Sequence, residues 1–164
     1  MKLVPYAQAI KRKYPEAVCL ATTIDNAGKP NVMPVGWEML TSVHPPMMAI
    51  SVARQAYTNE LIRLTKEFVV CFPGEDIVDQ VMFCGAHSGR NVDKFAGSGL
   101  TPVPASRVQP PLIGECLAAF ECKLVNEVCT GDHTLFVGEV VASHISAKTQ
   151  RRLFSLGGGM FGGL

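Results

Sequence analysis

Residues 129–140 read CTGDHTLFVGEV and place a turn directly before a β-strand. From Thr134 onward the side chains are mostly β-branched or apolar, which is typical of a strand. Gly131 and Asp132 are favoured turn residues, and a histidine beside them is often only a solvated strand end. His133 therefore belongs either to an ordinary turn or to a functional site at the mouth of a strand, and the stretch alone leaves both interpretations open.

The rest of the chain continues the β-rich pattern, because short apolar runs alternate with Pro and Gly. We expect strands at 17–24, 31–40, 47–53, 68–72, 115–128 and 134–146, with a hairpin turn at 25–29. Pro34 and Gly36 indicate an edge strand or a bulge. Two helical pieces are expected, one capped by Thr58 and ending near Thr65, the other capped by Asp76. About six strands with so few helices predict an all-β barrel rather than a doubly wound sheet.

The composition indicates one folded domain over residues 1–164. Apolar residues make up 48% of the chain and charged residues 18%, which excludes disorder. The formal net charge of +1 gives no field that would attract nucleic acid or a membrane surface. No run approaches the roughly 18 apolar residues of a membrane span, and Gln8 and Lys11–Lys13 interrupt any signal-peptide core. We therefore expect a cytoplasmic protein with no membrane or nucleic-acid partner.

The six cysteines are expected to stay reduced, because the core looks sufficient without disulfides and no CxxC pair occurs. Four of them lie in apolar strand-like runs, where a thiol packs as a small hydrophobe. Cys84 and His87, with His44 and His133, are residue types that bind metals, but their spacing matches no structural zinc pattern. We predict no metal site. Nothing in the sequence brings a cysteine nucleophile together with His133.

Two stretches carry groups that would suit a phosphate. In the first, Arg54, Tyr57 and Thr58 lie where a strand ends and a helix begins. A helix N-terminus offers free N–H groups and a positive dipole end, and arginine adds a fork of donors. The plain alternative is a capped helix with a surface arginine.

The second stretch runs from Cys84 to Lys94. Its glycines allow a tight turn whose N–H groups can form an anion-binding nest, with the Ser88 hydroxyl as a further donor. Arg90 and Lys94 add positive charge nearby, and the plain alternative is a flexible surface loop. Taken together, the two stretches predict no more than a phosphorylated ligand.

Trp37 is the single tryptophan of the chain, and it lies between Gly36 and Glu38 at the kinked end of a predicted strand. A lone tryptophan usually belongs to the core. Beside a glycine, where a ligand can approach the backbone closely, it can also form the wall of a site for an aromatic cofactor.

From about Pro15 to Leu164, the chain resembles the flavin reductase-like family of FMN-binding split barrels, which includes the flavoredoxins. The resemblance rests on segments in the family's order: ATTIDNAGKPNVMPVGWEMLTSVHPPMMAISVARQAYTNELI, EFVVCFP, CGAHSGRNVDKFAGSGLTP, PLIGECLAAFECKLV and GDHTLFVGEV. The tail RRLFSLGGGMFGGL also resembles the family's usual ending.

The resemblance implies a Greek-key split β-barrel with a few short helices, which pairs into a homodimer and binds FMN near the interface. Matching positions imply a set of FMN-binding residues. Along the flavin ring these are Asn31, Gly36, Trp37, Glu38 and Met39. Around the ribityl chain and phosphate they are Ser51, Val52, Ala53, Arg54, Tyr57 and Thr58. The cradle is completed by Cys84, Gly85, Ala86, Ser88 and Lys94.

The resemblance also implies a role for His133. In similar reductases the Gly-Asp-His triplet places its histidine at the flavin face where the nicotinamide of NAD(P)H stacks. His133 is then the catalytic residue, which orients the hydride donor or stabilises the charge of the reduced flavin. Asp132 either orients the imidazole ring or simply makes the turn.

Three functions remain open from the sequence. The first is an NAD(P)H-dependent flavin reductase that passes electrons through FMN to free flavin, a ferric complex or a protein. The second is a flavoredoxin-like electron-transfer protein that does not itself oxidise NAD(P)H. The third is a non-redox split barrel that binds another phosphorylated ligand.

Overall fold

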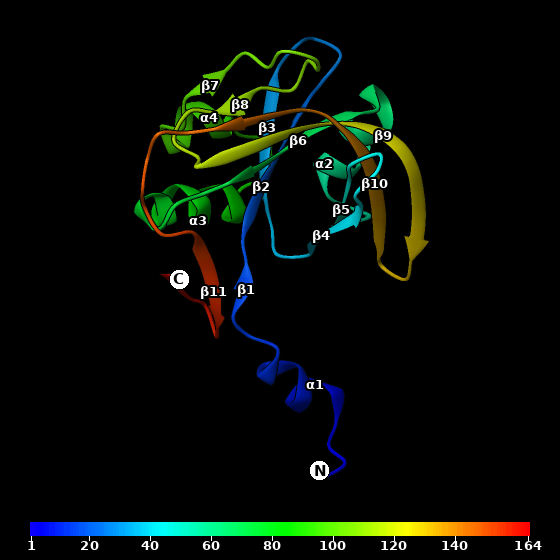
Figure 1. The fold of residues 1–164 in the computed structure, drawn as a ribbon, viewed down its shortest axis with the longest axis vertical. Helices are drawn as coiled ribbons and strands as arrows, with labels where there is room; N and C mark the ends of the chain where they lie inside the picture. Colours follow the sequence, from blue (N-terminus) through cyan, green and yellow to red (C-terminus); the bar gives the residue numbers. More distant parts are fainter.

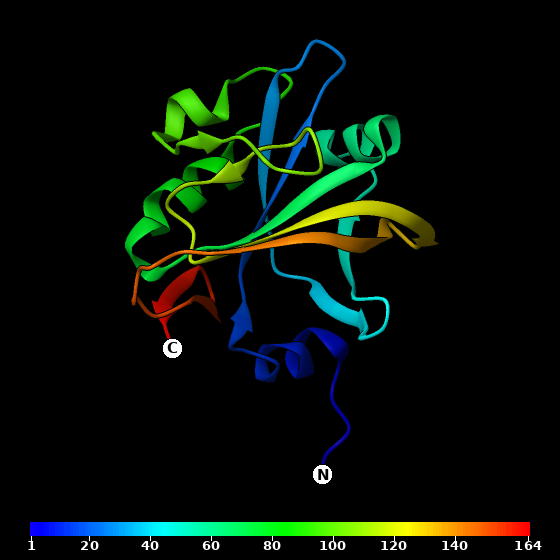
Figure 2. The ribbon, with the colours of Figure 1, turned by 45° about the horizontal axis from the view of Figure 1, so that its top comes forward.

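The centre of the molecule is a seven-stranded antiparallel sheet with the strand order β3-β2-β6-β9-β10-β5-β4. The computed structural model describes all residues 1–164. The seven strands are β2 (Cys19–Ile24), β3 (Pro30–Val35), β4 (Glu38–Ser42), β5 (Met47–Ala53), β6 (Glu67–Phe72), β9 (Ala118–Thr130) and β10 (His133–Ile145). The sheet is strongly curved, and β3 also contacts β5, so the sheet folds round into a split barrel (Figures 1 and 2). The expected all-β Greek-key split barrel is confirmed.

Two buried clusters lie on opposite faces of this sheet. In β2, Leu20 belongs to the outer cluster, whereas Cys19 and Ala21 belong to the inner one. β6 alternates in the same way, with Val69 on the outer face and Val70 on the inner face. Because successive side chains of a strand point to opposite faces, a sheet covered on both sides needs continuous apolar runs. This is why these strands read as unbroken apolar sequence.

Three helices pack around the barrel: α2 (Tyr57–Thr65), α3 (Val78–Ala86) and α4 (Lys94–Ser98). α2 buries Ile62 in the inner cluster, and α3 and α4 cover the outer face with Val81 and Phe95. α1 (Tyr6–Ala9) and the 3-10 helix η1 (Ile10–Arg12) extend away from the body and bury no side chain (Figure 1). No helix combines the length and the apolar character that crossing a membrane would need.

Two small sheets complete the fold. The first joins β1 (Glu16–Ala17), β11 (Leu153–Gly157) and β12 (Met160–Gly163), and the second pairs β7 (Pro102–Val103) with β8 (Leu112–Ile113). The glycine-rich end of the chain is therefore an ordered hairpin. Gly158 has φ +62°, which a glycine adopts without strain.

Several predicted boundaries were wrong. The expected strand 31–40 is broken at Gly36 and Trp37, so that β3 and β4 lie at opposite edges of the large sheet. The proline indicated the edge position correctly, but not the break. Thr58 does not cap α2, because the capping position is Ala56. Asp76 lies in the 3-10 helix η2 (Glu75–Ile77), which precedes α3.

Candidate functional site

Three adjoining pockets line up along β3 and the end of α3. The Lys94 pocket, of about 360 Å³, contains Met33, Gly85 and Ala86. The His133 pocket, of about 290 Å³, shares Met33 with it. The Phe161 pocket, of about 530 Å³, shares Gly85 and Ala86 with the first pocket, and it shares Pro34, Val35, Gly36 and Trp37 with the second.

Lys94 is the buried cation of the first pocket. Its side chain is only 5% exposed, and Nζ donates hydrogen bonds to the carbonyl oxygens of Val32 at 2.9 Å and Cys84 at 2.8 Å. Burial lowers the pKa of Lys94. An ammonium group has three donors, so one N–H of Lys94 remains for a ligand in the pocket.

Asn31 is fixed beside Lys94 by two hydrogen bonds. Its Nδ2 donates to Thr23 Oγ1 at 3.1 Å and to Thr58 Oγ1 at 3.0 Å, which orients the amide. Its Oδ1 is buried and has no hydrogen-bond partner in the chain. A Cβ added at Gly89 would collide with this oxygen, so only glycine fits there. An acceptor left unsatisfied at a pocket is suited to a donor on a ligand.

The N-terminus of α2 forms the facing wall through Gln55, Ala56, Tyr57 and Thr58. No side chain caps this helix, so its first N–H groups are free and carry the positive end of the dipole. The guanidinium of Arg90 lies 4.7 Å from the Tyr57 ring centroid and pairs with Glu60 at 2.8 Å. Arg90 thus ties the 88–90 turn to α2.

Two predicted cofactor residues line neither these three pockets nor the fourth one beside Trp37. Val52 is fully buried in the inner cluster, and its carbonyl accepts a hydrogen bond from Asn59. The Arg54 side chain is exposed and lines none of the pockets, although its backbone N–H bonds to the Asp132 carbonyl. Successive side chains of β5 point to opposite faces of the sheet, and that of Val52 points into the core. Arg54 follows the end of β5, where the chain leaves the sheet. The predicted set of FMN-binding residues did not contain Met33, Gln55, Ala56, His87 and Gly89, which do line the Lys94 pocket.

The remaining predicted cradle residues do gather at the Lys94 pocket: Asn31, Tyr57, Thr58, Cys84, Gly85, Ala86, Ser88 and Lys94. Cys84 is buried on α3, and burial raises the pKa of its thiol. A thiol in such surroundings is a poor nucleophile. His87 points its Nδ1 to the Phe83 carbonyl at 2.9 Å, so it is engaged within its own helix turn.

His133 lines the second pocket. Its ring centroid lies 4.8 Å from that of Trp37, and its Nδ1 lies 2.7 Å from Asp132 Oδ1. Gly131, with φ +62°, makes the turn between β9 and β10 that brings the two side chains together. The hydrogen bond with His133 lowers the pKa of Asp132. Asp132 therefore both makes the turn and orients the imidazole.

Trp37 is a wall and not a core residue, because it is 51% exposed. It separates the His133 pocket from a fourth one, of about 310 Å³, in which Glu38, Met39 and Ser51 meet Tyr6 of α1. Ser51 lines both pockets, and Ala53 lines the His133 pocket. Glu38 is half-buried, and burial raises its pKa.

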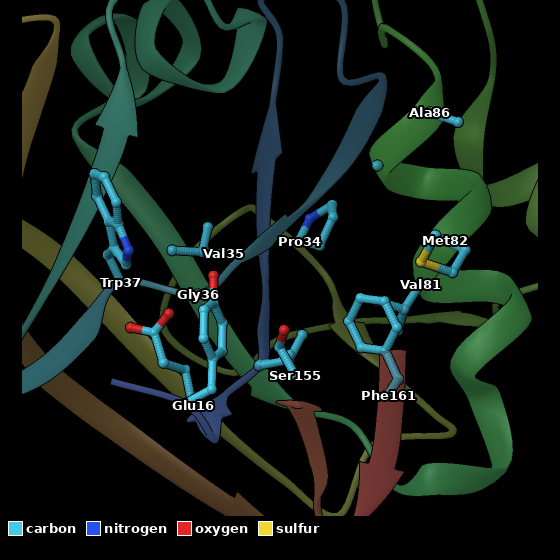
Figure 3. Close-up of a pocket in the computed structure, with 13 residues that line it drawn as sticks. Glu16, Pro34, Val35, Gly36, Trp37, Val81, Met82, Ala86, Ser155 and Phe161 are labelled. Carbon is cyan, nitrogen blue, oxygen red and sulfur yellow. The ribbon is translucent and has the colours of Figure 1, made fainter. Parts of the chain in front are cut away.

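The Phe161 pocket is bounded by residues far apart in the sequence. Figure 3 shows Trp37 on one side, Met82 and Phe161 on the other, and Glu16 and Ser155 between them. Glu16 and Ser155 are paired across β1 and β11, and Ser155 is paired with Phe161 across β11 and β12. Strands this short carry no periodic pattern, so they could not be recognised from the sequence.

Residues 11–161 match the family described as the flavin reductase like domain. An uncharacterized protein of Archaeoglobus fulgidus is 39% identical over 118 residues, which cover 72% of this chain and 67% of that protein. The alignments cover 67%, 64% and 61% of the first three curated relatives, so the chain spans about two thirds of their length or less.

Two solved structures resemble the whole fold. Flavoredoxin of Desulfovibrio vulgaris (Miyazaki F) superposes with a TM-score of 0.84 at 28% identity, and covers 92% of this chain and 87% of that one. The FMN-binding protein from Thermus thermophilus, with bound 1-cyclohex-2-enone, gives a TM-score of 0.85 at 25% identity. That match covers 99% of this chain and 92% of the Thermus chain.

Proposed function

The chain belongs to the flavin reductase-like family, and we propose that it is an FMN-binding oxidoreductase that takes electrons from NAD(P)H and passes them to an acceptor. The observation that carries the proposal is the continuity of two pockets. The Lys94 pocket is rich in donors, and the His133 pocket has an aromatic wall at Trp37. A ligand with an anionic end and a flat aromatic end matches both.

The residues of the Lys94 pocket fit FMN. The free N–H of Lys94 and the uncapped first turn of α2 suit a phosphate. The unsatisfied Oδ1 of Asn31 needs a donor, and a ribityl hydroxyl is one. Gly89 lets the 88–90 turn approach Asn31 Oδ1 closely, because a Cβ at this position would collide with that oxygen. FMN, when bound, supplies the hydride and single-electron chemistry, for which this chain offers no side chain of its own.

His133 is the residue that we assign to the nicotinamide. With Nδ1 donating to Asp132, its Nε2 accepts a hydrogen bond when the ring is neutral and donates one when the ring is protonated. Either state can hold a polar group of a hydride donor against the pocket. Asp132 fixes the ring orientation, which reduces the entropy lost on binding.

The second candidate uses the same site without the nicotinamide. The likeness to a flavoredoxin, at 28% identity over 92% of the chain, favours a protein that carries electrons between protein partners. In both functions FMN binds at Lys94. The reductase is reduced by a nicotinamide nucleotide, either NADH or NADPH. The electron carrier is reduced by neither of them.

The test is an absorbance spectrum of the freshly purified protein, followed by anaerobic addition of NADH and then NADPH. Flavin bands that bleach with one nucleotide establish the reductase and its donor. A yellow protein that bleaches only with dithionite establishes the carrier. A colourless protein that takes up no FMN on titration removes both functions and leaves the non-redox barrel.

We also propose that the protein is a homodimer. Large apolar side chains are exposed on and beside β4: Met39, Leu40 and Val43, with Tyr6 nearby on α1. A patch of this kind, next to a site, commonly marks a protein interface. A second copy seated there would cover the Trp37 side of the site.

A further inference from the structure

We infer that the Phe161 pocket binds a planar, apolar carbonyl compound of the quinone class and holds it beside the flavin site as the electron acceptor. The inference rests on the proposed function for its redox role, but not for the binding itself. The pocket is the largest of those described, at about 530 Å³, which suits a small molecule. Most of its lining residues are hydrophobic.

The apolar walls come from three separate elements. Val81 and Met82 of α3 and Phe161 of β12 form one side, Val35 and Trp37 form the other, and Pro34 lies between them (Figure 3). Met82 is 47% exposed, as expected for a side chain at an open rim. A flat ring buried between these surfaces would exclude water from both.

The polar groups are gathered at the floor. Glu16 and Ser155 are cross-strand partners, and directly opposite residues of an antiparallel pair point to the same face. Tyr14 lies two residues before Glu16, and its ring packs against Gly157, where a Cβ would come within 2.9 Å of it. Tyr14, Glu16 and Ser155 all line the pocket.

The floor favours an acceptor atom on the ligand. No hydrogen bond within the chain engages the Tyr14 or the Ser155 hydroxyl, and each can donate one. Glu16 is ion-paired with Lys13, and its Oε1 is buried and accepts no hydrogen bond, so the two hydroxyls are the donors of the floor and Glu16 is its acceptor. Hydroxyl donors in an apolar pocket are matched by the carbonyl oxygens of a planar ligand.

The Phe161 pocket adjoins the proposed flavin site, because the two share lining residues. Gly85 and Ala86 belong to both the Phe161 pocket and the Lys94 pocket, and Gly36 and Trp37 belong to both the Phe161 pocket and the His133 pocket. In the reaction, NAD(P)H and one proton reduce the quinone to its hydroquinone and leave NAD(P)+. Two electrons and two protons reach the quinone oxygens.

The experiment is equilibrium dialysis of duroquinone against the FMN-loaded protein and its variants. Duroquinone is fully methylated, so it does not add the exposed thiol of Cys129. Tyr14→Phe and Ser155→Ala each remove one donor, and we expect each to raise the dissociation constant about threefold to tenfold. Met82→Trp fills the rim and should raise it more than either. Ser143→Ala removes the same group as Ser155→Ala at an exposed position outside the pocket and should leave the dissociation constant unchanged.

Equal dissociation constants in all of these proteins would overturn the inference. Loss of duroquinone binding on saturation with FMN would also overturn it, because the pocket would then belong to the flavin ring. A parent protein that binds no duroquinone would overturn it as well, for example because a second copy fills the pocket. Failure of NADH and NADPH to bleach the flavin, with the variant pattern intact, would instead contradict only the proposed function.

Discussion

At the scale of single residues, Lys94 and Arg54 show how differently two cations near one site are placed. Lys94 is buried, with two carbonyl partners and one donor to spare. The Arg54 side chain is exposed and lines none of the pockets around the site. Both suit a phosphate by residue type, and only the structure distinguishes them.

Lys94→Met should therefore weaken FMN binding, whereas Arg54→Ala should not. Loss of a charge-assisted hydrogen bond of about 1.5–3 kcal/mol raises the FMN dissociation constant roughly tenfold to a hundredfold. Flavin fluorescence titration measures this constant, and circular dichroism checks that the variants are folded. An equal loss in both variants would show that Arg54 reaches the ligand after all.

His133→Ala should keep FMN and slow its reduction by the nicotinamide. Removal of one oriented group at a reacting centre costs roughly 10²-fold in rate. Stopped-flow absorbance under anaerobic conditions gives the rate. His44→Ala, which changes an exposed histidine outside the pockets, is the control. Unchanged flavin reduction in His133→Ala would remove the catalytic assignment.

At the scale of elements, β10 and the chain around Glu121 hold the barrel together. Gly138 lies where β10 passes the Phe68 ring, and a Cβ there would come within 2.6 Å of the ring and 2.8 Å of Cys122 Cβ. The register of β9 and β10 also shifts between Val137 and Gly138. The glycine thus allows the bend of a long strand over a large core side chain.

Gly138→Ala should lower the free energy of unfolding by about 1–3 kcal/mol, because the core must shift to admit the methyl group. Urea denaturation measures it. Gly36→Ala is the matched control, since no atom lies within 4 Å of a Cβ at that position. A similar loss in both variants would mean that glycine flexibility, and not crowding by Phe68, sets the effect.

Glu121 of β9 anchors the 106–108 segment from inside the fold. Its buried carboxylate accepts hydrogen bonds from the backbone N–H groups of Ser106, Arg107 and Val108 and contacts His144 Nε2 at 2.6 Å. Burial acts to raise the pKa of Glu121, but the hydrogen bonds from Ser106, His144 and Arg107 outweigh it and lower the pKa to about 2.

A carboxylate with a lowered pKa stabilises the fold above its unfolded pKa, and this stabilisation is lost as the pH falls toward the folded value. Glu121 should therefore contribute at pH 7 and lose that contribution between about pH 4.5 and 2. Glu121→Gln should destabilise the protein by about 3 kcal/mol at pH 7 and by less at pH 3. Urea denaturation at both pH values tests this, and a difference independent of pH would contradict it.

At the scale of the whole molecule, the apolar face of β4 is the feature that a single copy leaves uncovered. Leu40 is 76% exposed and Val43 is 91% exposed. We predict that the protein elutes and scatters light as a dimer, at about twice 17.7 kDa. Leu40→Asp should shift it toward the monomer, because burying an unpaired charge in an interface is costly. A parent protein that is monomeric at all concentrations would contradict the dimer.

The fold class and much of the site could be predicted from local patterns in the amino-acid sequence. Continuous apolar runs broken by Pro and Gly are enough for a β-rich barrel, because burial on both faces of a sheet requires them. The segments around Trp37, Cys84 and His133 also pointed to the right regions, since each combines a chain reversal with polar groups.

Which of these side chains contact one another depends on the three-dimensional fold. It split the 31–40 segment into strands at opposite edges of the sheet, turned Val52 into the core, and buried Lys94 beside Asn31. It also built the Phe161 pocket from β1, α3 and the C-terminal hairpin, which are more than 60 residues apart along the chain. A local sequence pattern shows the spacing of apolar residues and the turn-forming residues of one segment. Pairing between distant strands depends on their packing together, and no single segment encodes it.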